Sequence, residues 1–442
     1  MMITILTSFL GGSVKVDGKR LPGPIAEANG LLAKLKDIWP SKARVLLICA
    51  DPKDYEKNDS VQYCLREGFF MSGLPVSSVD MCDDRNEALA DDISIYDVII
   101  LTGGHVPTQN AFLRKIGLKE KLKGFDGILL AWSAGSMNCA DIVYAGPELD
   151  GEAIDPEFKR WIPGLGLTSV NMFPHFQSLR DEILDGLRVI EDITYADSMG
   201  HEILALNDGS YIVIKDGHTE LFGEAYRILD GQQELICKNR ESIPVSEIVL
   251  KARREIADRS NSFEDQTKGT ADEYNIYREH IRYVHKYVVS LSAGKAVDME
   301  ALELSALLHD IAMTDMSLDR NRHNEYGADI AAEFLRENGY PEEKIQLVKK
   351  CILNHSKRRS EYRTTPEEQI LVDADGLSHF DSYKSLYSLA HNVMRLNDED
   401  SLKFIQSKLT GDYNELSDNL KYLVSDIYAD IMRARSVQEI LG

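Results

Sequence analysis

The chain has 442 residues, enough for two or three domains of about 150 residues each. Hydrophobic residues make up 43% of it and charged residues 28%, which is ordinary for a globular protein and excludes disordered and collagen-like chains. The formal net charge of −22 gives an acidic surface that repels phosphate backbones, so we expect neither duplex nucleic acid nor an anionic membrane as a partner.

Two features of the sequence indicate the compartment. No apolar run approaches the about 20 residues that span a bilayer, and the first residues, Met1–Gly12, lack the basic start and cleavage site of a signal peptide. The six cysteines are scattered and form no C-x-x-C pair: Cys49, Cys64, Cys82, Cys139, Cys237 and Cys351. We therefore expect a cytoplasmic protein whose thiols are free and buried.

Up to residue 237, short apolar runs alternate with segments of helix length. We expect strands at Ile3–Ser8, Arg44–Ala50, Asp97–Leu101 and Gly127–Ala131. Continuous apolar strands between helices predict a parallel sheet that is covered on both faces. Farther along, Glu202–Leu206 and Tyr211–Lys215 flank the turn sequence Asn207-Asp208-Gly209, which predicts a β-hairpin.

The strand at Gly127–Ala131 runs into a cluster of small residues, Ser133-Ala134-Gly135-Ser136. A serine on a sharp strand-to-helix turn needs small neighbours, and the helix that follows directs free N–H groups at an oxyanion. Ala131 stands where the first glycine of such a nucleophile elbow is usual. The pattern equally fits a tight turn whose serine merely caps the helix, and the two interpretations stay open at this point.

Two further segments favour catalysis. Gly103 and Gly104 end the preceding strand, and paired glycines allow the backbone to approach a ligand closely. The N–H of Gly104 could therefore join that of Ala134 in an oxyanion hole. His175 lies beyond the elbow in Phe173-Pro174-His175-Phe176, where it could be packed between aromatic rings or complete a pair of nucleophile and base.

The order Gly-Gly, Trp-Ser-Ala-Gly-Ser, Pro-His-Phe and Asp-Gly-Ser resembles the dipeptidase E and cyanophycinase family of serine peptidases over roughly residues 1–235. The resemblance implies a three-layer, class I glutamine-amidotransferase-like α/β fold without a cofactor. It also implies Ser133 as nucleophile, His175 as general base and then acid, and Asp208 as the carboxylate that orients the histidine. Asp-Gly is also ordinary turn chemistry, so Asp208 keeps a structural alternative.

One departure from the family concerns the substrate. The paired glycines are followed by His105–Asn110, where family members commonly continue with Asn-Thr. No residues that would bind an N-terminal aspartate can be identified in this sequence, so the family's preference for such peptides is not carried over. An amidotransferase is disfavoured because those enzymes use cysteine at the elbow.

The second half of the chain has a helical periodicity. A helix is expected after Pro244, and the polar sequence behind it, up to Thr270, indicates a linker. We therefore divide the chain into a peptidase-like α/β domain at residues 1–237, a helix and polar linker at 238–271, and an all-α domain at 272–442. In the last domain, apolar residues three and four apart predict helices at Asp272–Leu291, Met299–Ile311, Glu325–Glu337 and Pro341–Leu353.

Histidines and aspartates recur along these helices. His309 and Asp310 end an apolar helix, where two neighbouring polar side chains would cost stability unless a ligand satisfied them. A metal ion is such a ligand, and imidazole together with carboxylate suits a transition metal or an ion of the Mn or Mg type. The spacings resemble the HD phosphohydrolase superfamily over roughly residues 272–385.

By this resemblance one metal ion would be held by His280, His309, Asp310 and Asp375. His323 and His355 match the extra histidines of subfamilies that hold two ions, with Asp310 bridging them. Asp373 lies in the same short motif as Asp375 and is the alternative candidate for the metal ligand. His323 lies in a polar segment that could be a solvated loop. The basic run Lys357–Arg359 could clamp phosphate oxygens or form a solvated face.

Together these patterns predict a cytoplasmic bifunctional hydrolase, in which a Ser-His-Asp peptidase is fused to a metal-dependent HD phosphohydrolase. Its partners would be a small peptide and a nucleotide or small phosphate ester, and its cofactor one or two divalent ions such as Mn, Fe or Mg. Two alternatives stay open. One domain could bind a ligand and control the other, or the helical half could be a two-iron oxygenase. The oligomeric state is open as well.

Overall fold

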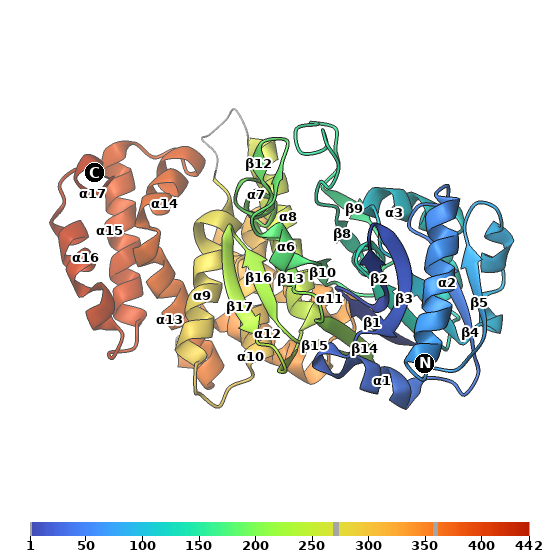
Figure 1. Ribbon diagram of the computed structural model, residues 1–442. Helices are drawn as coiled ribbons and strands as arrows, with labels where there is room; N and C mark the ends of the chain where they lie inside the picture. The colour runs from blue at the N-terminus through green and yellow to red at the C-terminus, as the bar shows by residue number, and fades with distance from the viewer. Residues whose placement is uncertain (1, 268–273, 357–360, 442) are drawn as a thin grey trace. The chain divides into compact units, whose positions relative to one another are not determined.

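The computed structural model describes residues 2–267, 274–356 and 361–441. It divides into two compact units, Met1–Glu247 and Ile248–Gly442 (Figure 1). The expected linker is helical from Arg259 to Thr267, with Ser260 and Phe263 buried, so this part is not an irregular linker. Its end, residues 268–271, and the basic run Lys357–Arg359 lie outside the described residues. Within the described ranges, no helix has the length and apolar character needed to cross a membrane.

The first unit is built on an eight-stranded sheet with the order β18-β15-β14-β1-β7-β6-β4-β5. From β1 to β5 the neighbouring strands are parallel, and β14, β15 and β18 extend the sheet in antiparallel pairing. The parallel strands are apolar and largely buried, as the continuous apolar runs predict. The strands are β1 (Ile3–Thr7), β4 (Ala43–Ile48), β5 (Val76–Cys82), β6 (Val98–Leu101), β7 (Ile128–Trp132), β14 (Tyr211–Lys215), β15 (His218–Phe222) and β18 (Ser242–Pro244).

Helices connect the parallel strands. The longest of them, α2, begins at an N-cap, Asp54, whose carboxylate accepts a hydrogen bond from the backbone N–H of Lys57. The helices of this unit include α1 (Leu31–Ile38), α2 (Tyr55–Met71), α3 (Val106–Lys115), α4 (Leu118–Leu122), α5 (Ala134–Met137), α6 (Phe176–Leu179) and α7 (Tyr195–Asp197). The predicted α/β fold with a mostly parallel sheet is thus confirmed.

A second sheet of four strands has the order β10-β13-β16-β17. Its strands are β10 (Asn171–Phe173), β13 (Ile203–Leu206), β16 (Ala225–Leu229) and β17 (Gln232–Cys237). Short two-stranded ribbons complete the unit: β2 (Gly11–Val16) with β3 (Lys19–Ile25), β8 (Ile142–Tyr144) with β9 (Trp161–Pro163), and β11 (Ile183–Leu184) with β12 (Leu187–Arg188).

The predicted hairpin around Asp208 is wrong. β13 and β14, which flank the turn, do not pair, because β13 pairs with β10 and β16 whereas β14 pairs with β1 and β15. The turn itself exists, since the N–H of Ser210 donates to the carbonyl of Asn207 at 3.0 Å, but it passes the chain from one sheet to the other. Asp208 therefore follows the carboxyl end of β13, and β13 runs parallel to β10.

The second unit is helical, which confirms the predicted change of class. Its first long helix, α8, begins at Glu247, at the end of the first unit, and α13 opens with a capping box between Thr365 and Glu368. The helices are α8 (Glu247–Thr267), α9 (Arg282–Ser292), α10 (Met299–Leu308), α11 (His323–Glu337), α12 (Glu342–Asn354), α13 (Pro366–Asp381), α14 (Tyr383–Ser388), α15 (Asp398–Glu415), α16 (Lys421–Arg433) and α17 (Val437–Leu441).

Three short helical turns carry residues of interest between these helices. They are η5 (Tyr277–Ile281), η6 (Ile311–Thr314) and η7 (Arg320–Arg322). One apolar cluster packs α8, α10, α11 and α12 together, and a second packs the end of α13 against α15 and α16. A third cluster packs Ile370, Leu371 and Ala374 of α13 against α9 and α10, so α13 takes part in the second and third clusters.

Candidate active sites

Ser133 stands on a sharp turn between β7 and α5. Its backbone has φ 53° and ψ −124°, a conformation that residues with a side chain rarely adopt. The neighbouring chain is packed so closely that a Cβ on Gly103 would lie 2.6 Å from Trp132 Nε1, and one on Gly135 would lie 2.4 Å from the carbonyl oxygen of Leu101. This packing explains why small residues surround the serine.

Two backbone N–H groups lie beside this turn. Gly104 follows β6 and Ala134 opens α5, and in the described residues neither N–H donates a hydrogen bond. His105 comes next and is held on both ring nitrogens, by Thr108 Oγ1 at 2.7 Å and by Glu152 Oε1 at 2.9 Å. The segment that departs from the family pattern is therefore the ordered start of α3.

His175 and Asp208 follow the ends of the adjacent parallel strands β10 and β13. His175 Nδ1 lies 2.7 Å from Asp208 Oδ1, so the carboxylate holds the Nδ1 proton. Partial burial would raise the pKa of Asp208, but the hydrogen bonds from His175 and Ser8 keep it below its usual value. His175 also has a positive φ, 59°, which turns the chain sharply between β10 and α6.

Ser8 joins this pair and was missed by the sequence reasoning. Its hydroxyl donates to Asp208 Oδ1 at 2.9 Å and accepts from the backbone N–H of His175 at 2.9 Å. The backbone N–H of Asp208 donates to Gln177 Oε1 at 2.9 Å. The signal available in the sequence was the polar residue at the carboxyl end of the first apolar strand, the edge where Gly104 and Ser133 also lie.

The structure thus joins His175 to Asp208 directly and places Ser133 after β7 at the carboxyl edge of the main sheet. Within the described residues, no hydrogen bond links Ser133 Oγ to His175. The side chains of His175 and Asp208 are 33% and 37% exposed, so a substrate in solution can reach them. Hydrogen bonds of catalytic groups are often long or absent before substrate binds.

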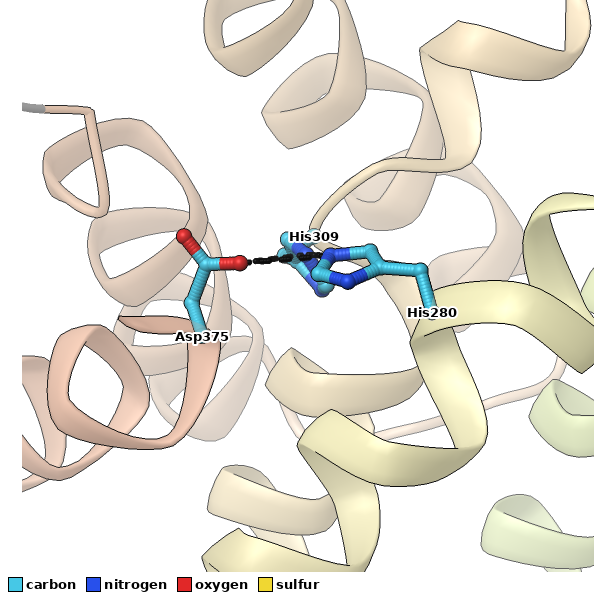
Figure 2. A group of neighbouring side chains, drawn as sticks. All are labelled: His280, His309 and Asp375. Carbon is cyan, nitrogen blue, oxygen red and sulfur yellow. Dashed lines mark hydrogen bonds and ion pairs between the residues drawn. The ribbon is translucent and has the colours of Figure 1, made fainter. Parts of the chain in front are cut away.

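The second site lies in the helical unit, where His280, His309 and Asp375 converge (Figure 2). They come from η5, the end of α10 and α13. His280 Nε2 lies 3.1 Å from His309 Nε2 and 3.2 Å from Asp375 Oδ1, as the dashed line in Figure 2 marks for the carboxylate. His309 and His280 are buried almost completely.

A second group forms beside the first from Asp310, His323 and His355. His323 Nε2 lies 3.1 Å from His355 Nε2, and Asp310 Oδ1 lies 3.5 Å from the former and 3.7 Å from the latter. The other oxygen, Asp310 Oδ2, lies 3.6 Å from His309 Nε2 and 3.7 Å from His280 Nε2. One carboxylate therefore faces both groups.

The contacts of the Nδ1 atoms show which tautomer these histidines adopt. The Nδ1 atoms of His309, His323 and His355 each lie within 3.0 Å of a backbone carbonyl, and that of His280 lies 3.2 Å from Ser378 Oγ. Nδ1 must donate to a carbonyl, so in the neutral rings of His309, His323 and His355 each Nε2 carries a lone pair. These lone pairs face the other members of the two metal-ligand groups. The hydroxyl of Ser378 donates to the carbonyl of Asp375, so it accepts from His280 in the same way.

This arrangement fits metal ions. Two acceptor nitrogens 3.1 Å apart without a proton between them repel each other, and a cation between them removes the repulsion. Ligands at ~2.1 Å from an ion and at right angles to each other lie ~3 Å apart. Asp310 Oδ1 is moreover buried with no hydrogen-bond partner among the described residues. The donor set is four imidazoles and two carboxylates, of which Asp310 faces both groups, and it suits a transition metal.

The electrostatics favour the protonation states that bind metal. Burial lowers the pKa of His355 to about 3, and the neighbouring His309 and His323 lower it too. Burial also lowers the pKa of His309. Burial would raise the pKa of Asp310, but the surrounding histidines bring it well below its usual value. The imidazoles of His309 and His355 are therefore neutral and the carboxylate of Asp310 is ionised at neutral pH, as metal ligands must be.

The structure gives Asp373 and Asp375 different contacts. Asp375 contacts His280, whereas Asp373 accepts hydrogen bonds from the backbone N–H and hydroxyl of Ser417 at 2.8 Å and 2.7 Å. The two carboxylates are two positions apart on α13 and so point in different directions. Asp373 thus ties α13 to the loop after α15.

Sequence reasoning missed three residues beside the metal groups. His379 stacks on His280 with ring centroids 4.6 Å apart, and its Nδ1 lies 3.3 Å from Asp412 Oδ2. Lys408 Nζ lies 3.4 Å from Asp412 Oδ1. The available signal was a pair of charged residues four apart on α15, in line with the buried Ser401 and Ile405.

The two sites define a class of protein in which a serine-type α/β unit is followed by a helical metal-binding unit. Comparison with protein families agrees with this division. Residues 31–222 match the family model of peptidase family S51, and residues 277–379 match that of the HD domain. The chain therefore combines a peptidase family S51 domain with an HD domain, and it is a hydrolase.

Comparison with known proteins gave the following further results. Among proteins with curated descriptions, none matches the chain. Solved structures that match part of it include a peptidase E protein from Listeria monocytogenes EGD-e, with 12% identity over 53% of this chain and 99% of that one, at a TM-score of 0.33. An HD superfamily hydrolase from an uncultured Thermotogales bacterium matches at 20% identity over 40% of this chain and 91% of its own, at a TM-score of 0.26.

Proposed function

We propose that the chain is a bifunctional hydrolase, a Ser-His-Asp peptidase fused to a metal-dependent HD phosphohydrolase. The observation that carries the proposal is the presence of two complete sets of reactive groups in separate units of one chain. One is the strained Ser133 with the His175–Asp208 pair, and the other is the pair of metal-ligand groups that share Asp310. The peptidase would act on small peptides and the HD unit on a nucleotide or small phosphate ester.

In the peptidase, Ser133 Oγ would attack the scissile carbonyl while His175 Nε2 takes its proton. Asp208 holds the Nδ1 proton and stabilises the imidazolium that forms. The N–H groups of Gly104 and Ala134 would donate to the oxyanion, and His175 would then protonate the leaving amine. Ser8 fixes the geometry, because one hydroxyl bonds both to the carboxylate of Asp208 and to the backbone of His175.

In the HD unit, bound divalent ions would lower the pKa of a bound water and neutralise charge on phosphoryl oxygens. His280, His309 and Asp375 would hold one ion and His323 and His355 the other, with Asp310 shared. The backbone carbonyls that accept from Nδ1 fix each ring in place.

The proposal has a direct test. Ser133→Ala should abolish peptide hydrolysis and leave metal-dependent phosphate ester hydrolysis intact, and His309→Ala should do the reverse. If both variants fold and each loses both activities, the two sites are not independent. A regulatory role for one domain is supported instead if ligand binding at one site, without turnover, changes the rate at the other.

The shared Asp310 and the imidazole-rich ligand set also favour a second candidate for the HD unit, a two-iron oxygenase. Elemental analysis together with oxygen electrode measurements separates the two. Stoichiometric iron with substrate-dependent oxygen uptake supports the oxygenase, whereas phosphate release with Mn or Mg and no oxygen uptake supports the phosphohydrolase.

We further propose that the protein works in the cytoplasm. All six cysteines are free and buried, as expected for a protein of a reducing compartment. Burial raises the pKa of Cys139 and of Cys351, to about 12 for the latter, so these thiols are unreactive at neutral pH. Fractionation of cells that express the tagged chain would test this placement.

A further inference from the structure

The metal groups open into a cavity of 480 Å³ in the helical unit. His280, Asp310, His323, His355 and Asp375 line one part of it. The match to the HD domain ends at residue 379, but the cavity continues onto α15, which contributes Phe404, Lys408, Asp412 and Glu415. This wall therefore lies outside the matched segment and belongs to this chain's C-terminal helices.

Lys408 brings a cation to this wall. Its ammonium group lies 3.4 Å from Asp412 Oδ1, one helical turn farther along α15. Asp412 is itself fixed, since its side chain is 2% exposed and its other oxygen lies 3.3 Å from His379 Nδ1. The side chain of Lys408 is 30% exposed. The ammonium group is therefore anchored but accessible from the cavity.

The charges around Lys408 keep it protonated. Burial would lower its pKa, but the carboxylates of Asp412, Asp375 and Asp310 raise it above its usual value. Burial would raise the pKa of Asp375, but the neighbouring His379 and Lys408 lower it below its usual value. Lys408 thus lies close enough to the metal ligands to affect their charge, although it is not one of the ligands itself.

We propose that Lys408 binds an anionic oxygen of the substrate's phosphoryl group in the metal cavity, and that Asp412 positions its ammonium group. This inference rests on the proposed phosphohydrolase function. Asp310 and Asp375 lose their uncompensated negative charge once they ligate cations, so the field of Lys408 then acts on the anion that enters the cavity. An ammonium–phosphate contact is a charge-assisted hydrogen bond, the strong kind.

Calorimetric titration of the metal-loaded, full-length protein with inorganic phosphate tests the proposal. Lys408→Met should weaken phosphate binding by about 10- to 100-fold, the size expected for one charge-assisted hydrogen bond. Lys408→Arg should keep most of the affinity, and Asp412→Asn should lose part of it. The KM for a phosphate ester should rise in parallel with the loss of phosphate affinity in each variant.

Lys403→Met is the matched control. Lys403 lies on the same helix and pairs with Glu399 at 2.7 Å, but its side chain is 62% exposed and does not line the cavity. This variant should bind phosphate like the wild type. Metal content, by elemental analysis, and unfolding temperature should be unchanged in Lys408→Met, which separates substrate binding from a structural role.

Three results would overturn the inference. The first is unchanged phosphate affinity in Lys408→Met, and the second is a loss of affinity that follows loss of metal or of folding. A wild-type protein that fails to bind phosphate would overturn it as well. If phosphate binds through Lys408 but no phosphate ester is hydrolysed, the proposed function fails while the binding role of Lys408 stands.

Discussion

The two candidate sites of this chain differ in the backbone structure that positions their side chains. The serine site depends on strained backbone, since Ser133 and His175 both have positive φ angles and project from turns at the ends of strands. The metal site depends on regular helices and turns, where backbone carbonyls hold the rings of His309 and His355 in place. In the proposed mechanism, the strained turn places the nucleophile Ser133 within reach of substrate, and burial keeps the imidazole ligands neutral for a cation.

The two sites also differ in the solvent exposure of their side chains. The side chains of His175 and Asp208 are about a third exposed, whereas that of His309 is fully buried. The proposed peptide substrate would reach the serine site from solvent. A metal site, in contrast, gains affinity when its imidazoles are desolvated and do not take up protons. The comparison predicts that changes at the serine site affect catalysis alone, and changes at the metal site affect stability and ion content as well.

The largest effect is expected for Ser133→Ala. Removal of the nucleophile should lower the rate of peptide hydrolysis by at least about 10⁴-fold, because the remaining groups cannot form the acyl-enzyme. The unfolding temperature and metal content should stay unchanged. A steady-state peptidase assay with elemental analysis checks both, and substantial residual peptidase activity would show that another residue is the nucleophile.

Asp310→Ala should have the next largest effect. It removes the carboxylate that faces both ligand groups, so both ions should be lost and phosphate ester hydrolysis should fall by ~10³-fold. Asp373→Asn is the control, because Asp373 bonds to Ser417 and contacts neither group. Retention of two ions per chain in Asp310→Ala would contradict a shared ligand.

A third test uses pH. The buried His355 has its pKa lowered to about 3, whereas it titrates near 6.5 when unfolded. Between these values the unfolded chain binds the extra proton, so the metal-free helical unit should lose stability as the pH falls from neutral. At pH 5 the loss from His355 amounts to about 2 kcal/mol.

Urea unfolding of chelator-treated protein, followed at several pH values, measures this loss. His355→Gln should remove that part of the pH dependence, because glutamine does not titrate. Parallel pH profiles for the variant and the wild type would contradict the buried neutral histidine. Ser133→Ala, by contrast, should leave the profile unchanged.

The smallest effect is expected for Ser8→Ala. It removes the hydroxyl that links Asp208 to the backbone of His175, so kcat for peptide hydrolysis should fall by about 10-fold with KM unchanged. Ser210→Ala is the matched control, because its hydroxyl donates to the carbonyl of Glu224 and not to the catalytic pair. Equal kinetics in the two variants would exclude a positioning role for Ser8.

Much of the fold could be predicted because the buried face of a strand or helix requires apolar residues at a regular spacing in the sequence. The continuous apolar runs correspond to β1, β4, β6 and β7, and the spacing of apolar residues corresponds to α10 and α12. The hairpin failed because local turn chemistry cannot tell which strand a segment pairs with. β13 and β14 each have a better partner far away in sequence, β10 and β1.

The candidate sites could be predicted to the extent that their residues stand in short motifs. Ser133, His309 and Asp310 follow that rule. Lys408, Asp412 and Ser8 reach their sites only through tertiary packing, from elements that carry no motif of their own. Resemblance to the HD superfamily could not identify Lys408 as a site residue, because the segment that matches the HD domain ends before α15 begins.

The backbone of Ser133 has an evolutionary consequence. A side chain held at φ 53° and ψ −124° costs of the order of 1–3 kcal/mol, and glycine would relieve that strain. In a lineage that no longer needed peptide hydrolysis, selection for a more stable fold would therefore favour glycine at position 133. Under the proposed mechanism, serine at position 133 would distinguish descendants that keep peptidase activity from those that have lost it.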